Sequence, residues 1–342
     1  NLTTGTHDGR ISAVLDTLVS HGAPEDVVWS HKPHIGTDKL PGVIKNMREE
    51  IISLGGEVKF EAKLTDIIVY NSSVQGITFE EKGRSIDFET DTVILAVGHS
   101  ARDTVKMLFR KGIQMIQKPF SVGARIEHPR ELIDKSQYGD FAGHKALGAA
   151  DYKLACHSQH ERGAYTFCMC PGGYVVAAAS EDGGIVTNGM SNADRDGENA
   201  NAALLVTVNP QEFPYQGALG GMYWQRDVEE AAYRVSNSYM APAQLVGDFL
   251  ADRKSTKMGA VRPSCPTGVS PSDIREVLPK SVTDIMAEAL LMMDKKLNGF
   301  AMPEAVLTFP ETRSSSPVRF LRDDYFECSM GGDPLGGTYP CG

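Results

Sequence analysis

Five side chains that bind metals or take part in redox chemistry lie close together near the middle of the chain. The stretch CHSQHERGAYTFCMC contains them: Cys156, His157, His160, Cys168 and Cys170. Zinc accepts cysteine and histidine, but its structural sites usually combine two matched pairs of ligands, a spacing that this stretch lacks, and we predict no metal site. Cys168 and Cys170 are one residue apart, so in a strand both sulfur atoms face the same side of the sheet. A metal site, a redox pair and small buried thiols all remain open, and the buried thiols are the ordinary case.

A second group of polar side chains lies in the stretch ETRSSSPVRF, between two apolar segments. A guanidinium and several hydroxyl groups in one loop can bind an anionic substrate. The alternative is a solvated hairpin loop with no ligand. We predict a substrate-binding loop made of Arg313, Ser314, Ser315 and Ser316. Arg313 and Cys170 are the candidate catalytic residues.

The composition of the chain argues against several classes of protein function. The chain has 342 residues, enough for about two domains, and 41% hydrophobic residues, as is typical of a globular protein. A net charge of −10 argues against a nucleic-acid partner, and the sequence contains no apolar run long enough to span a membrane. Six cysteines are too few for a disulfide framework in a chain of this length. We therefore expect a cytoplasmic protein with a small-molecule substrate.

Several familiar catalytic motifs are missing from the sequence. It contains no Gly-x-Ser-x-Gly elbow, no His-Glu-x-x-His and no phosphate-binding Gly-x-x-x-x-Gly-Lys-Ser/Thr loop. These absences argue against the common hydrolases and nucleoside triphosphatases. The candidate side chains above must therefore be interpreted from the elements that position them.

The first third of the chain has the pattern of an α/β domain. Residues 43–54 carry apolar side chains at helical spacing, with Pro41 in the first turn and Gly55 at the end. A short strand is expected at residues 57–62. Residues 63–90 predict three short antiparallel strands with turns at positions 71–72 and 82–83. The apolar run TVILAVG predicts a buried strand over residues 92–98, followed by a helix that ends near residue 112.

The pattern changes after residue 113. Strands and loops predominate up to about residue 210, residues 217–252 are mostly helical, and residues 281–297 predict a helix with a capping box of Ser281 and Asp284. We predict a mixed α+β substrate domain over 114–325. It is inserted between residues 1–113, a partial dinucleotide-binding domain, and residues 326–342, which return to that domain.

This order of elements and several motifs together resemble the uncharacterised bacterial FAD-dependent dehydrogenases, a family of predicted NAD(FAD)-utilising oxidoreductases. The motifs are HIGTDKLPGVIKNMREEI, TVILAVGHSARDT, KPFSVGARIEHP, YTFCMCPGGYVVAAASE and GGIVTNGMS. The resemblance implies FAD as cofactor, NADH or NADPH as electron donor, and hydride transfer through the flavin. It also implies the fold class: α/β and α+β, a truncated two-dinucleotide-binding flavoprotein domain with the mixed substrate domain inserted in it.

The resemblance further implies which residues hold the cofactor. It places Leu2, Thr3 and Thr4 at the flavin ring and Val58 at the adenine. It places Ala96, Val97 and Gly98 along the rest of the dinucleotide. In that family a Rossmann unit with a glycine-rich loop precedes these residues and a flavin-facing segment follows them. The present sequence contains no Gly-x-Gly-x-x-Gly loop. We expect a piece of a longer enzyme that alone holds no stoichiometric FAD and is inactive; the alternative is a non-catalytic ligand- or partner-binding module on a flavoprotein fold.

Overall fold

The computed structural model describes residues 8–30, 33–158 and 162–328. The chain divides into two compact units. The first, here called the sheet unit, consists of residues up to Glu57, Ser121–Thr207 and Val228–Thr312. The second, the meander unit, consists of Val58–Phe120, Val208–Asp227 and the residues from Arg313 onward. Within the described ranges, no helix combines the length and the apolar character needed to cross a membrane.

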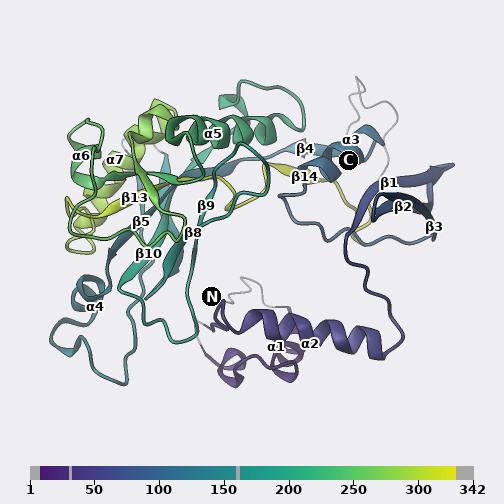
Figure 1. Cartoon of the computed structure of the whole chain (residues 1–342), viewed down its shortest axis with the longest axis horizontal. Helices are drawn as coiled ribbons and strands as arrows, with labels where there is room; N and C mark the ends of the chain where they lie inside the picture. The colour runs from purple at the N-terminus through teal and green to yellow at the C-terminus, as the bar shows by residue number, and fades with distance from the viewer. Residues whose placement is uncertain (1–7, 31–32, 159–161, 329–342) are drawn as a thin grey trace. The chain divides into compact units, whose positions relative to one another are not determined.

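A seven-stranded sheet is the centre of the sheet unit (Figure 1). Its strands, in spatial order, are β12 (Val269–Pro271), β11 (Ala241–Leu245), β13 (Val306–Glu311), β5 (Phe120–Pro129), β10 (Asn199–Val208), β7 (Gly163–Cys170) and β6 (Ala155–His157). β11 and β12 pair in parallel. β13 pairs antiparallel with β5 and β11, and β7 pairs antiparallel with β10 and β6. The two longest strands, β5 and β10, are buried over nearly their whole length. They form the core because central strands are covered on both faces.

Helices and a hairpin cover the sheet. α7 (Lys280–Asp294) packs on β6 and β7 through a buried apolar stripe, and the hairpin of β8 (Tyr174–Ala177) and β9 (Thr187–Met190) packs on β7 and β13. The unit also contains α1 (Ile11–Ser20), η1 (Glu25–Val28), α2 (Leu40–Ser53), α4 (Arg130–Tyr138), η2 (Gly139–Phe141), α6 (Val246–Leu250), η4 (Ile274–Glu276) and the later part of α5 (Gly220–Ser236).

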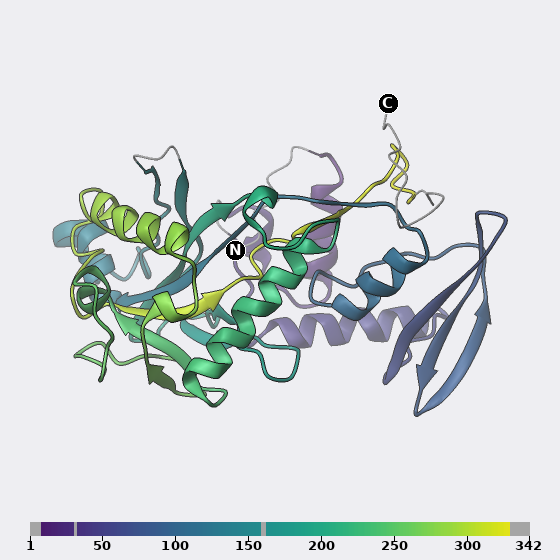
Figure 2. The ribbon, with the colours of Figure 1, turned by 90° about the horizontal axis from the view of Figure 1, so that it is seen from above.

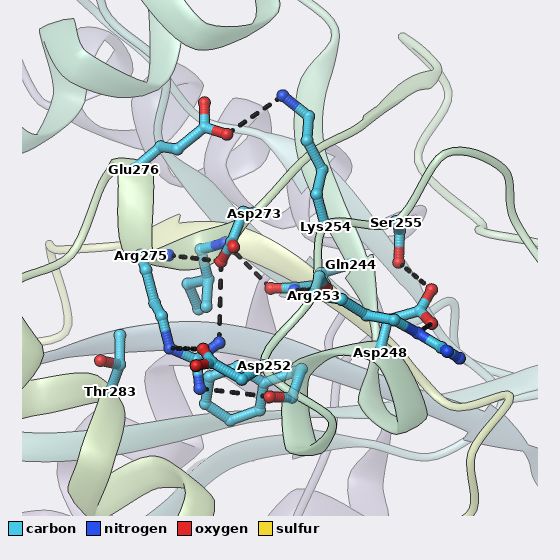
Figure 3. A network of polar contacts seen from close by, with 12 residues as sticks. Gln244, Asp248, Asp252, Arg253, Lys254, Ser255, Asp273, Arg275, Glu276 and Thr283 are labelled. Atoms are coloured by element: carbon cyan, nitrogen blue, oxygen red, sulfur yellow. Dashed lines mark hydrogen bonds and ion pairs between the residues drawn. The ribbon is translucent and has the colours of Figure 1, made fainter.

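A polar network joins the segment after β11 to η4 (Figure 3). Arg275 contacts Asp252 at 3.1 Å, lies over the ring of Phe249 and donates to the carbonyl of Phe249. Gln244 on β11 donates to the carbonyl of Arg253 and accepts from the backbone N–H of Ile274. These contacts connect chain segments to one another, so we interpret the network as structural.

The meander unit has a small core of its own. The three strands β1 (Ala62–Tyr70), β2 (Ser73–Glu81) and β3 (Arg84–Glu89) form an antiparallel sheet, which Figure 2 shows as a twisted blue ribbon. The unit also contains α3 (Arg102–Arg110), η3 (Pro210–Glu212), the first part of α5, and the pair β4 (Met115–Gln117) and β14 (Val318–Phe320). One cluster of buried apolar side chains in this unit consists of Ile67, Val105, Leu108, Met115, Leu219, Met222 and Val318.

Turn chemistry explains why the meander was predictable. Asn71 and Ser72 have φ of 49° and 61°, and Lys82 and Gly83 have φ of 51° and 77°. Two consecutive residues with positive φ match the twist of the flanking strands in a two-residue hairpin. The three-stranded meander is therefore confirmed, as are the helix of residues 40–53 and the helix that ends before Gly112.

Three predicted features are wrong. Residues 92–98 form no strand, and Ile94 is 89% exposed. An apolar run becomes a buried strand only where neighbouring strands accept its backbone hydrogen bonds, and none of the described strands pairs with it. Val58 likewise lies in irregular chain, because β1 begins at Ala62. α7 begins at Lys280 with no side-chain cap, and Asp284 pairs with Lys280 instead of capping the helix.

Gly123 in β5 provides a test of the strand packing. A Cβ atom at this position would lie 1.9 Å from the carbonyl oxygen of Leu204 on β10. Because that oxygen belongs to the backbone of a buried strand, it cannot move aside. We expect Gly123→Ala to lower the free energy of unfolding by about 2 kcal/mol or more in urea denaturation.

Gly163→Ala is the matched control for this test. Gly163 lies in β7 of the same sheet, and a Cβ atom there has no neighbour within 4 Å among the described residues. We expect its free energy of unfolding to stay within about 0.5 kcal/mol of the unsubstituted protein. Equal effects of the two substitutions would contradict the close approach of β5 and β10.

Candidate functional site

The side chain of Arg125 is the largest fully buried one among the described residues. It lies in the central strand β5, and its guanidinium contacts three other strands. Nε and Nη2 donate to Oδ1 of Asn201 on β10 at 3.0 and 2.5 Å, and Nη1 donates to Oε2 of Glu311 on β13 at 3.2 Å. Nη2 also donates to the carbonyl of Cys168 on β7 at 2.9 Å and to Sγ of Cys170 at 3.5 Å. A buried charge is stable only with such partners.

Gly189 on β9 covers the guanidinium from the hairpin side. A Cβ atom at Gly189 would lie 1.8 Å from Nη2 of Arg125 and 2.4 Å from Oδ1 of Asn201. Every other residue type would collide with the hydrogen-bonded pair. The β8–β9 hairpin can therefore close over the arginine only because residue 189 has no side chain.

Glu311 is the anionic partner of Arg125 and is 3% exposed. Burial raises the pKa of its carboxyl to about 7, although the charge of Arg125 opposes that shift. The carboxyl therefore exchanges its proton near neutral pH, while the guanidinium stays charged at any pH that a protein experiences. A group that titrates near pH 7 can accept or release a proton under ordinary conditions.

The two cysteines lie where the pairing of β7 with β10 is irregular. Asn201 pairs with Cys170, and the register shifts before the next pair, Ala203 with Phe167. Cys168 has a φ of 44°, in the left-handed region that favours glycine. It is exposed and Cys170 is buried. The bulge thus presents one thiol at the surface and holds the other beside Arg125.

The thiols have opposite pKa shifts. A hydrogen bond from Cys170 and the charge of Arg125 lower the pKa of the Cys168 thiol to about 5. The same hydrogen bond and burial raise the pKa of Cys170. Cys168 is therefore a thiolate and Cys170 a thiol at neutral pH. A thiolate is the nucleophilic form of cysteine, so this arrangement can support thiol chemistry.

Two further titratable groups of β5 are buried nearby. Burial raises the pKa of Glu127, whose Oε1 accepts hydrogen bonds from Nδ2 of Asn199 and from the backbone N–H of Ser264. Burial lowers the pKa of His128 to about 4, and its Nε2 lies 2.7 Å from the carbonyl of Phe300. Successive side chains of a strand alternate, so Arg125 and Glu127 face one side of the sheet and His128 the other.

The residues predicted from sequence are not all in this cluster. Cys170 is part of it. The loop with Arg313, Ser314, Ser315 and Ser316 follows β13 directly and is half-buried, and Oγ of Ser316 donates to the carbonyl of Val318 at 2.8 Å. The candidate cofactor residues Ala96, Val97 and Gly98 are exposed in irregular chain, and Val58 is half-buried. The described residues do not include Leu2, Thr3, Thr4 or His160. Among the described residues, no cluster of three possible metal ligands occurs.

Sequence reasoning missed Arg125, Asn201 and Glu311. The strand FSVGARIEHP contained one usable signal, because it carries Arg125 and Glu127 two positions apart in a largely apolar run. Two charged residues on one face of a buried strand require buried partners. Nothing in the sequence indicates that those partners come from β10 and β13.

Comparison with known proteins identifies the family. Residues 119–314, which include the whole Arg125 cluster, match the family described as "FAD-dependent protein, C-terminal domain-like". The chain belongs to this family. An uncharacterized protein of Clostridium beijerinckii is 47% identical over 343 residues, which cover 100% of this chain and 63% of that protein. The chain thus spans less than two thirds of the length of this relative.

Two solved structures are distantly similar to the chain. A triple mutant of the flavin-dependent brominase Bmp2 aligns with 53% of this chain and 36% of its own, at 12% identity and a TM-score of 0.30. The structure titled flavin-dependent brominase Bmp2 aligns with 51% and 33%, at 12% identity and a TM-score of 0.28. Scores this low carry no argument about fold or function. The family assignment therefore rests on the match of residues 119–314.

Glu311 predicts a pH dependence of stability. Folding raises the pKa of this carboxyl from about 4.3 in the unfolded chain to about 7. Its contribution to stability is therefore fully present below pH 4.3 and is lost as the pH rises from there through 7. Glu311→Gln removes the titration. We expect the stability of the unsubstituted protein, relative to this variant, to fall on the order of 3 kcal/mol between pH 4 and 7.

The measurement is urea denaturation of both proteins at several pH values. The difference between them isolates Glu311, because His128, whose contribution to stability falls as the pH is lowered, is present in both proteins and cancels. A difference that does not change with pH would show that the carboxyl of Glu311 has an ordinary pKa.

Proposed function

We propose that the chain is the main part of an FAD-dependent oxidoreductase that acts on a small-molecule substrate. The observation that carries this proposal is the family match of residues 119–314. A bound flavin supplies hydride or electron transfer, and the protein supplies binding and electrostatics. NADH or NADPH is the proposed electron donor, and a dehydrogenase reaction is the proposed class.

One observation supports a dinucleotide site at Gly98. Gly98 has a φ of 67°, and a Cβ atom there would have no neighbour within 4 Å in the described part of the chain. The backbone of Ala96, Val97 and Gly98 is therefore open to the close approach that a dinucleotide requires. We assign these three residues to dinucleotide binding.

The substrate is proposed to bind at the loop that follows β13. Arg313 provides a guanidinium for an anionic group, and the three serines after it provide hydroxyl groups.

Flavin content is the direct test of the cofactor. We expect the longer Clostridium beijerinckii relative to purify with about one FAD per chain, released by heat and identified by chromatography. Anaerobic addition of NADH or NADPH should bleach the flavin absorbance. The present chain, measured beside it, shows how much of the cofactor its own residues hold. A relative that binds no FAD, even after incubation with excess cofactor, would overturn the proposal.

Arg313→Ala is the test of the substrate loop. In the longer FAD-binding protein that contains this chain, we expect turnover with a substrate found by screening to fall by about 30- to 150-fold, because one charge-assisted contact contributes roughly 2–3 kcal/mol. The flavin content should stay unchanged. Arg319→Ala in β14, an exposed arginine of the same stretch, is the matched control and should retain full turnover. Equal turnover in both variants would remove Arg313 from the substrate site.

A further inference from the structure

Cys168 and Cys170 differ in exposure although only one residue separates them. The thiol of Cys168 is exposed, whereas that of Cys170 is buried beside the guanidinium of Arg125. Sγ of Cys170 donates to the carbonyl of Cys168 at 3.3 Å, so the buried thiol is held against the backbone of its neighbour. The pair therefore consists of one exposed cysteine and, two positions further along the chain, one buried cysteine.

The surroundings of the pair are not those of inert thiols. Ordinary buried cysteines lie among apolar side chains, as the raised pKa of Cys156 illustrates in β6 of the same sheet. The pair instead lies against a buried cation. Asn201, fully buried and opposite Cys170 in the register, has an Nδ2 without a hydrogen-bond partner among the described residues. The buried cation stabilises negative charge on a sulfur atom near it.

We propose that Cys168 and Cys170 are a redox-active dithiol that reduces small-molecule disulfides, with Cys168 as the attacking and Cys170 as the resolving thiol. This activity goes beyond the flavin chemistry proposed above, because the exchange itself needs no cofactor. The class of co-substrate is a disulfide of low molecular weight, such as oxidised glutathione.

The exchange balances in two steps. The Cys168 thiolate attacks one sulfur of the small disulfide, forms a mixed disulfide and expels one thiolate. The sulfur of Cys170 then attacks that of Cys168, the second small thiol leaves, and the proton of Cys170 passes to it. Two protein thiols have lost two electrons, and one small disulfide has gained them. The Cys168–Cys170 disulfide closes across a single residue, near the upper limit of the separation that disulfides allow, so it is constrained and readily reduced again.

Electrostatics favour this order of events. The groups that face the pair are Arg125 from β5 and Glu311 from β13, with Ser191 and Tyr152 near Cys170. While Cys168 carries the negative charge, Cys170 keeps its proton. Once Cys168 is in a mixed disulfide, that charge is gone, and the guanidinium 3.5 Å from Sγ of Cys170 stabilises its thiolate instead. One arginine thus activates each sulfur in turn.

The test uses the purified chain, reduced and then exposed to oxidised glutathione. Acid quenching, alkylation of remaining thiols and mass spectrometry identify the products. We expect a disulfide that joins Cys168 to Cys170 in the unsubstituted protein and a glutathione adduct on Cys168 in Cys170→Ser. Cys168→Ser should give neither product. Cys156→Ser, a buried cysteine outside the cluster, is the matched control and should form the disulfide normally.

A second measurement needs no substitution. Alkylation of an ordinary thiol speeds up about 75-fold between pH 6 and 8, because its thiolate fraction rises by that factor for a pKa of 8.5. We expect the rate at Cys168 to change less than twofold over the same range, since its pKa is about 5. An ordinary pH profile at Cys168 would overturn the proposal. The proposal would also be overturned if Cys168 and Cys170 stayed reduced when the folded protein is exposed to oxidised glutathione but became oxidised after denaturation. Flavin content would not affect either result, so this proposal can fail independently of the FAD proposal.

Discussion

The buried charge of Arg125 is the constraint on which the rest of the sheet depends. A guanidinium cannot lose its proton inside a protein, and removing it from water costs several kcal/mol unless hydrogen-bond acceptors replace the solvent. β10, β7 and β13 supply those acceptors through Asn201, the carbonyl of Cys168 and Glu311. One side chain therefore requires three strands in a particular register. Any slip of one residue would turn an acceptor away from the charge.

The same requirement explains the unfavourable backbone of Cys168. A positive φ is costly for a residue with a side chain and persists only where surrounding contacts compensate. The compensation here is at the carbonyl of Cys168, which accepts hydrogen bonds from both Arg125 and Cys170. A regular strand would direct this carbonyl along the ladder to β10. The bulge redirects it to the arginine and exposes the thiol of Cys168.

The sequence could predict local structure but not this site. The hairpins at Asn71–Ser72 and Lys82–Gly83 and the helix that ends before Gly55 follow from turn residues and spacing, which act over a few positions. The strand expected over residues 92–98 failed because burial depends on partners that composition does not reveal. The Arg125 cluster joins residues 43 to 186 positions apart, and no local pattern encodes such contacts. Among its members only the cysteines were visible, because two thiols close together suggest chemistry wherever they fold.

The single positive charge of Arg125 faces two groups that can each become negatively charged, Glu311 and Cys168. The protonation of one of these groups therefore affects that of the other. Burial raises the pKa of Glu311, Arg125 opposes that shift, and the charge of Cys168 adds a smaller increase. An apolar core would serve stability as well as a buried ion pair does, so the arginine is not explained by stability alone. Its effect is to couple the protonation of Glu311 to the state of the thiol. Conversion of Cys168 to a disulfide removes one negative charge, and the carboxyl of Glu311 then ionises at a lower pH. In the proposed dithiol reaction, the protonation of Glu311 on β13 therefore depends on the oxidation state of Cys168 on β7, while the guanidinium between them keeps its charge.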